Sequence, residues 1–269
     1  MTDYSIENLG RSFESLKMDL TVASFSAFAE ENKFTCEQIQ AIDVLFEHLR
    51  RSKEESTIYT LQKMSRLPLK NPKTFDNFDF SVVKGKDCER LKELRSLATI
   101  HAHKNLAFIG PSGTGKTHLA QAYGYECCLH GFKTYFIKMS ELRDKFTAAR
   151  RAGNESKVLN NLVRPSCLII DEVGHCEFDK ENTRLFFDLI DRRYNKEGSF
   201  NIVFTSNKNP SRWTDNFKDD SSLLCSLDRA FDDATVFTFR GESFRGKNLE
   251  TIELQTSKVK PETSETSKN

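Results

Sequence analysis

The stretch NLAFIGPSGTGKTHLAQA, residues 105–122, decides how the rest of the chain is interpreted. An apolar run leads into a glycine-rich loop, and a helical pattern begins at Lys116 and Thr117. Residues 110–117, GPSGTGKT, fit G-x-x-x-x-G-K-[ST] at every defined position. A strand, loop and helix in this order form a phosphate-binding site, because the loop amides and the helix N-terminus both face the same anion.

Each position of this loop has an expected part in holding a nucleotide. Its glycines let the backbone curl so that consecutive N–H groups point inward. Lys116 is expected to bridge the β- and γ-phosphates of ATP, and Thr117 to offer its hydroxyl to Mg²⁺. The predicted nucleotide-binding residues are Gly110, Pro111, Ser112, Gly113, Thr114, Gly115, Lys116, Thr117 and His118.

Two further strand ends carry polar residues suited to the same chemistry. In CLIIDEVG, residues 167–174, Asp171 ends an apolar run, where it is expected to hold Mg²⁺ through water. The adjacent Glu172 is placed to polarise an attacking water, which favours hydrolysis over transfer to a second substrate. In IVFTSN, residues 202–207, Asn207 is expected to reach that water or the γ-phosphate. Two ordinary acids at a strand end are the alternative for 171–172, and a complete upstream loop makes that alternative weaker.

Apolar strands alternate with helical patterns from about residue 86 onward. Strands are expected at 105–109, 133–139, 167–173, 200–207 and 235–241, and helices at 87–103, 116–130, 138–163 and 180–195, with a polar helical segment before the last strand. Short apolar strands separated by helices predict a parallel sheet covered on both faces, the α/β architecture of a P-loop NTPase. Residues 1–68 are expected to be mainly helical.

Composition excludes several classes of protein. The 269 residues carry a formal charge of +1 and contain no apolar run long enough for a membrane helix, and the N-terminus lacks a secretory signal. Seven scattered cysteines without a CxxC pair predict reduced thiols, and therefore a cytoplasmic protein rather than a disulfide scaffold or zinc site.

Residues 138–164 form a basic helical stretch, with seven basic and three acidic side chains. Such an excess suits sequence-independent contacts to DNA phosphates. The candidate DNA contacts are Lys145, Arg150, Arg151 and Lys157. A solvated basic face without any ligand is the alternative interpretation.

Taken together, the motifs resemble a known family. GPSGTGKT, LIIDEVG, TSN, LDR and GESFR, in this order, resemble the AAA+ ATPases of the DnaC-like branch, and most closely the IstB-like helpers of insertion-sequence transposases. The likeness covers roughly residues 35–246 and includes PKTFDNFDF at 72–80. It implies an AAA+ ATPase domain (86–249), which follows the N-terminal helical region (1–68) and a turn-rich connector (69–85). The tail (250–269) is expected to be disordered because it is rich in Ser, Thr, Lys and Glu.

The resemblance also implies roles for residues that chemistry alone does not single out. Asn207 becomes sensor 1, Arg229 an arginine finger acting on a neighbouring subunit, and Arg245 the sensor 2 arginine. Ala230 and Phe244 stand where the family often has Leu and Tyr, which weakens the finger assignment.

The implied activity is ATP hydrolysis by a homo-oligomer on double-stranded DNA that recruits or stimulates an IstA-like transposase. A DnaC-like replicative helicase loader is the nearest alternative. A small-molecule kinase would need a nucleotide lid and an acceptor pocket, neither of which is visible in the sequence. A binding module that uses ATP only as a switch would not need Glu172 for catalysis.

Overall fold

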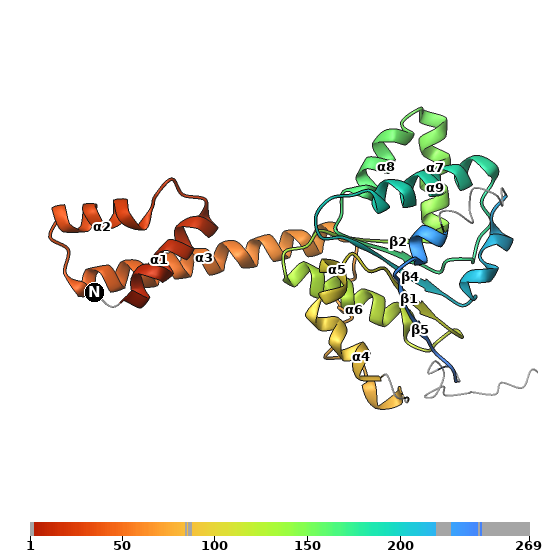
Figure 1. Ribbon diagram of the computed structural model, residues 1–269, viewed down its shortest axis with the longest axis horizontal. Coiled ribbons are helices and arrows are strands. Elements are labelled where there is room, and N and C mark those ends of the chain that lie inside the picture. The colour runs from red at the N-terminus through yellow and green to blue at the C-terminus, as the bar shows by residue number, and fades with distance from the viewer. Residues whose placement is uncertain (1–2, 84, 86–87, 219–226, 242, 244–269) are drawn as a thin grey trace, which may run out of the picture.

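A five-stranded parallel sheet forms the centre of the computed structural model, which describes residues 3–83, 85, 88–218, 227–241 and 243 (Figure 1). The strands are β1 (Leu106–Ile109), β2 (Thr134–Lys138), β3 (Cys167–Asp171), β4 (Asn201–Ser206) and β5 (Thr235–Thr238). They lie in the order β2-β3-β4-β1-β5, and all neighbouring pairs are parallel. The predicted parallel sheet is confirmed.

Helices cover both faces of this sheet, as Figure 1 shows. One face carries α4 (Cys88–Glu93), α5 (Ala98–His101) and α6 (Lys116–Leu129), and the other α7 (Met139–Ala152), α8 (Glu155–Val163) and α9 (Lys180–Tyr194). Successive strand residues point to opposite faces, so Ile169 and Ile170 of β3 belong to different apolar clusters. Burial on both faces explains why β3 and β4 are almost entirely apolar up to their last residues.

Two of the expected helices are broken in the structure. Residues 87–103 form α4, a 3₁₀ turn η2 (Leu94–Ser96) and α5, because Leu97 adopts a left-handed conformation (φ 57°) with its side chain buried. Residues 138–163 form two helices rather than one, since Gly153, also left-handed (φ 60°), ends α7. The expected polar helical segment before β5 contains the 3₁₀ turns η3 (Pro210–Arg212) and η4 (Thr214–Asn216), and residues 227–231 are helical.

The N-terminal region is helical, with α1 (Asp3–Leu16), α2 (Val22–Glu31) and α3 (Cys36–Met64). Capping boxes at Thr21 and Thr35 satisfy free amides at the starts of α2 and α3. A small apolar cluster that includes Phe13 and Phe25 joins the three helices.

Helix α3 connects these helices to the sheet (Figure 1). Its 29 residues make it about 44 Å long. Residues 51–60 are exposed apart from a half-buried Ile58, and Leu61 joins the core beneath the sheet. Within the described residues, no helix has the length and apolar character needed to cross a membrane. The connector that follows contains the 3₁₀ turn η1 (Phe80–Val82).

Candidate nucleotide-binding site

The glycine-rich loop lies between the end of β1 and the start of α6 and has no room for side chains at two positions. Gly113 and Gly115 have φ values of 78° and 90°, which favour glycine. A Cβ atom on Gly113 would lie 1.9 Å from Ser243 Oγ, and one on Gly115 would lie 2.8 Å from Phe78 Cε2. The loop is therefore enclosed by the connector on one side and by the segment after β5 on another.

Lys116 is held inside the curve of this loop. Its side chain is largely buried, and Nζ donates a hydrogen bond to the Pro111 carbonyl at 2.5 Å. The Thr114 hydroxyl donates to the same carbonyl at 2.9 Å. The ammonium group therefore lies among backbone groups of the loop, at the positive end of α6, where an anion would be attracted.

A hydrogen-bonded network joins the loop helix to the ends of two strands. Thr117 Oγ1 donates to Asp171 Oδ1 at 2.8 Å, and Thr205 Oγ1 donates to the same oxygen at 2.6 Å. Burial raises the pKa of Asp171, and the two threonine hydrogen bonds counteract part of that effect. One carboxylate therefore connects α6, β3 and β4.

The backbone turns sharply at Glu172, directly after Asp171. Its φ of 62° lies in the left-handed region, and its amide donates to Thr205 Oγ1 at 3.0 Å. The Glu172 side chain is half exposed and lies 3.4 Å from Lys138 Nζ at the end of β2. The sharp turn thus places one carboxylate in the core and the next at the surface.

Lys116, Thr117 and Thr205 line a pocket of about 290 Å³ at the carboxyl ends of the strands, and Asp171 lies behind its wall, bonded to Thr117 and Thr205. Asn207, Glu172 and Lys73 of the connector contribute to its wall, and the lining residues are Lys73, Ser112, Gly113, Gly115, Lys116, Thr117, His118, Gln121, Glu172, Thr205, Ser206 and Asn207. The structure thus brings the residues expected from three separate motifs into one cavity.

His118 links the pocket to the connector. Its Nε2 lies 3.0 Å from the Thr74 carbonyl, and its ring packs edge-on against Phe78, with centroids 5.1 Å apart. Burial lowers the pKa of His118. A neutral ring suits this packing, so His118 serves as a packing residue as well as a neighbour of the phosphate loop.

The oxygen atoms of Thr117 and Asp171 fit a magnesium ion bound together with a nucleotide. Mg²⁺ is commonly held by one or two protein oxygens, waters and substrate phosphates rather than by an all-protein cage. No cluster of three or more His, Cys, Asp or Glu side chains suited to a metal occurs among the described residues.

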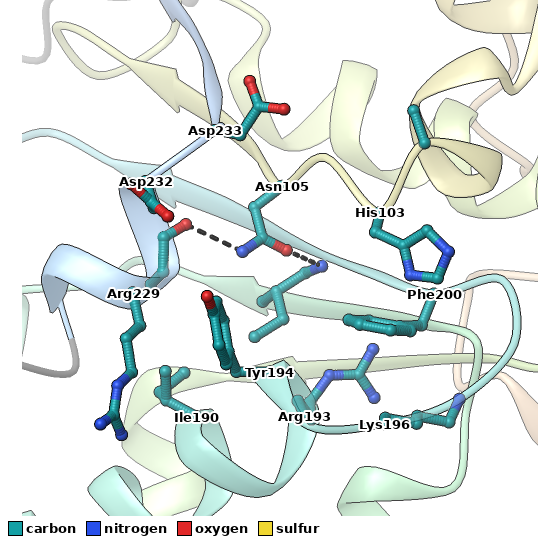
Figure 2. Close-up of a pocket in the computed structure, with 13 residues that line it drawn as sticks. His103, Asn105, Ile190, Arg193, Tyr194, Lys196, Phe200, Arg229, Asp232 and Asp233 are labelled. Carbon is teal, nitrogen blue, oxygen red and sulfur yellow. Dashed lines mark hydrogen bonds between the residues drawn. The ribbon is translucent and has the colours of Figure 1, made fainter.

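Arg229 lies near the amino ends of the strands, on the side of the sheet opposite the phosphate loop and beside a second pocket of about 290 Å³ (Figure 2). Asn105, which precedes β1, links β4 to the helical residues before β5. It accepts a hydrogen bond from the Ile202 amide at 2.7 Å and donates one to the Ala230 carbonyl at 2.8 Å. The Arg229 guanidinium forms an ion pair with Asp191. Since the phosphate loop follows the other end of β1, Arg229 does not reach the nucleotide site of its own chain. Arg245 lies outside the described residues.

The four DNA candidates occupy different environments. Arg151 and Lys157 are exposed near the α7–α8 turn, and Lys145 is half-buried on α7. Arg150 donates to Asp179 at 2.9 Å, and Asp179 in turn caps α9 through the Asn182 amide. Arg150 therefore has a structural partner, which leaves Arg151 and Lys157 as the more available cations of the set.

Thr205 and Lys138 contribute to the site but are absent from the sequence-based set. Both lie at strand ends, and their proximity to the Asp171–Glu172 pair depends on β3 lying between β2 and β4. A polar residue at the end of an apolar strand was the only available signal.

Comparison with known proteins places the chain in a family. The profile of the family described as IstB-like ATP binding protein matches residues 13–251. The ATP-binding protein named for insertion sequence IS5376 of Geobacillus stearothermophilus is 38% identical over 193 residues, which cover 72% of this chain and 75% of that protein. The one named for IS21 of Pseudomonas aeruginosa is 33% identical over 199 residues, covering 74% and 73% respectively.

Solved structures share the fold at lower identity. The replication initiator DnaA bound to AMPPCP and single-stranded DNA has a TM-score of 0.53 at 23% identity, covering 65% of this chain and 52% of that chain. The DnaC helicase loader has a TM-score of 0.51 at 18% identity, covering 62% of this chain and 96% of that one. The fold is that of an AAA+ P-loop domain with an N-terminal helical region, and the chain belongs to the family of IstB-like ATP-binding proteins.

Proposed function

We propose that this protein is an Mg²⁺-dependent ATPase that assembles as a homo-oligomer on double-stranded DNA and recruits or stimulates an IstA-like transposase. The observation that carries the ATPase part is the buried Asp171 carboxylate, which bonds Thr117 of the phosphate loop and Thr205 of β4. Family membership and relatives named for insertion sequences and ATP binding support the rest. Such a role would be carried out in the cytoplasm.

Each residue of the pocket has a separate proposed role in hydrolysis. ATP with Mg²⁺ supplies a phosphoanhydride whose cleavage releases free energy. Lys116 and the loop amides bind the phosphates, and Thr117 and Asp171 would hold the ion. Glu172, at the exposed side of the turn, polarises a water, and Asn207 orients it from the end of β4.

Assembly and DNA binding are proposed for two other surfaces. Arg229 would act on the nucleotide of a neighbouring subunit, since it lies near the amino ends of its own strands, away from its own phosphate loop. Arg245 is proposed as the sensor 2 arginine on the strength of the family resemblance. Arg151 and Lys157 would contact DNA phosphates, with Lys145 nearby on α7.

Electron microscopy and gel filtration with duplex DNA and a non-hydrolysable ATP analogue test the central claim. We expect discrete DNA-bound oligomers for the wild type and for Lys133→Ala, which changes an exposed lysine outside the pocket. Lys116→Ala should lose them because it removes the phosphate-binding ammonium. A monomer that ignores both nucleotide and DNA would contradict the proposal.

Hydrolysis itself is tested with Glu172→Gln. Loss of the water-polarising carboxylate should slow single-turnover hydrolysis by about a hundredfold or more while ATP remains bound. Equal rates for Glu172→Gln and the wild type would mean that Glu172 is not catalytic, and would favour a module that uses ATP only as a switch.

The salt dependence of DNA affinity tests the proposed contacts. Arg151→Gln combined with Lys157→Gln should weaken binding and reduce the slope of log affinity against log salt by up to about 2. A charge-matched control in the N-terminal region, Arg11→Gln of α1 with Lys33→Gln of the turn after α2, should leave the slope unchanged. The same loss in both double variants would point to net charge rather than a defined surface.

A replicative helicase loader is the second candidate, and the match to nearly the whole DnaC chain favours it at the level of fold. The identity of the partner protein distinguishes the two functions. Stimulation of DNA strand transfer by an IstA-like transposase would support the first, whereas loading of a replicative helicase onto DNA would support the second.

A further inference from the structure

The outward face of α3 carries apolar side chains that are exposed to solvent. Ala41, Val44, Leu45, His48 and Leu49 follow the i, i+3, i+4, i+7, i+8 spacing of a single helix face. Val44, Leu45 and Leu49 are 62%, 54% and 43% exposed. These five residues are referred to below as the α3 outer stripe.

The stripe adjoins the face by which α3 packs against the other N-terminal helices. Ile39 and Phe46 lie on that packed face, and the rings of Phe46 and Phe13 are 5.0 Å apart, whereas Ile42 lies at the border, seven residues before Leu49. Helix α3 therefore has two apolar faces, and its inner face already completes the local core. An additional exposed apolar stripe is typical of a protein-binding surface.

Charge distinguishes this region from the rest of the protein. Residues 3–47 contain nine acidic and three basic side chains, a formal charge of −6, so the remainder carries +7. Arg50 and Arg51, directly after the stripe, pair with Glu47, so the acidic excess that would attract a basic partner is that of α1, α2 and the start of α3.

The chain itself offers poor occupants for the stripe. Residues 250–269, TIELQTSKVKPETSETSKN preceded by Glu250, are polar and nearly neutral, and Ile252, Leu254 and Val259 are their only large aliphatic residues. Symmetric pairing of two copies would bring together two regions of the same strong negative charge. Charge complementarity thus favours a different protein with basic side chains.

We propose that the α3 outer stripe docks a basic amphipathic α-helix of a partner protein. Leucine-type residues of that helix would pack on Val44, Leu45 and Leu49, and its flanking lysines or arginines would face the acidic N-terminal helices. The exposed segment 51–60 holds this surface away from the nucleotide site (Figure 1). Docking would therefore leave the sheet domain free for nucleotide and DNA, and the inference does not depend on ATP hydrolysis.

A synthetic peptide tests the chemistry directly with the full chain. The probe is a fluorescent amphipathic helix of leucine and lysine, about 18 residues or five turns long. Fluorescence anisotropy should show binding at least about tenfold tighter than to a leucine–glutamate counterpart or to a scrambled leucine–lysine sequence. Leu45→Gln with Leu49→Gln should weaken binding by at least about tenfold. Leu129→Gln, which changes a leucine 39% exposed at the end of α6, should not.

Hydrogen exchange of the wild type provides a second readout that needs no variant. Addition of the leucine–lysine peptide should slow exchange in residues 40–50, and protection centred elsewhere would overturn the proposal. Equal binding of the leucine–glutamate peptide would also overturn it, because charge would then play no part. Dimerisation in sedimentation velocity that Leu45→Gln with Leu49→Gln abolishes would assign the stripe to a second copy. Nucleotide and DNA binding by this double variant should match the wild type, so a failure of the proposed ATPase function would be seen separately.

Discussion

Removal of the Thr205 hydroxyl should weaken both the fold and the catalytic arrangement. Thr205 is buried in β4, where it donates to Asp171 at 2.6 Å and accepts from the Glu172 amide at 3.0 Å. A hydrogen bond to a charged group contributes about 1.5–3 kcal/mol, and loss of the amide's partner adds about 1 kcal/mol. We therefore expect Thr205→Val to lower the free energy of unfolding by roughly 2.5–4 kcal/mol, while Thr205→Ser, which keeps the hydroxyl, should lose much less.

Trp213 makes this effect measurable close to its origin. It is the chain's only tryptophan, it is fully buried, and its indole N–H donates to Ser206 at 3.1 Å, next to Thr205. Urea unfolding followed by its fluorescence should report the loss, and single-turnover hydrolysis should fall about tenfold or more because Glu172 is no longer positioned by Thr205. A Thr205→Val protein within 1 kcal/mol of the wild type would refute this reasoning about the network.

Three further outcomes are expected elsewhere in the chain. Arg229→Ala should retain ATP binding but lose about a thousandfold in hydrolysis by DNA-bound assemblies; loss of binding in a nucleotide titration would assign Arg229 another role. Burial, and secondarily the charge of Glu47, raise the pKa of Asp43, so its ionised form opposes folding above that pKa and the penalty disappears as pH falls through it. Asp43→Asn should therefore melt higher in circular dichroism at pH 7, with a gain that shrinks in acid; an equal gain at every pH would contradict this origin. Burial, and then the Arg193 guanidinium, lower the pKa of Lys196 to about 8, so its acetylation rate measured by mass spectrometry should have a midpoint near pH 8 rather than near that of an ordinary lysine.

The local parts of the site were predictable, and the contacts between strands were not. The phosphate loop is continuous in sequence, and Gly113, Gly115, Lys116 and Thr117 of that loop all line one cavity. Thr205 lies 34 positions from Asp171, and the two residues meet because β4 pairs with β3. The sequence predicts parallel strands, but strand order depends on packing of whole helices on the sheet.

The basic residues show a second limit of sequence reasoning. Arg150 and Arg151 are equivalent in a count of charge, yet Arg150 bonds Asp179 whereas Arg151 lies on the exposed side of α7. Leu97 shows a third limit, since burial of its side chain accompanies a left-handed backbone that helical periodicity does not anticipate. In each case a tertiary partner, rather than local preference, decides the outcome.

The continuous helix between the N-terminal helices and the sheet domain fixes a direction as well as a distance. Each residue inserted between positions 51 and 60 would rotate the N-terminal helices by about 100° about the α3 axis and move them about 1.5 Å. An insertion of seven residues nearly restores the original azimuth. An insertion of two residues, in contrast, turns the outer stripe to almost the opposite side. A partner seated there is thus presented at a set angle to the nucleotide pocket, and the helical phase of α3 determines that angle.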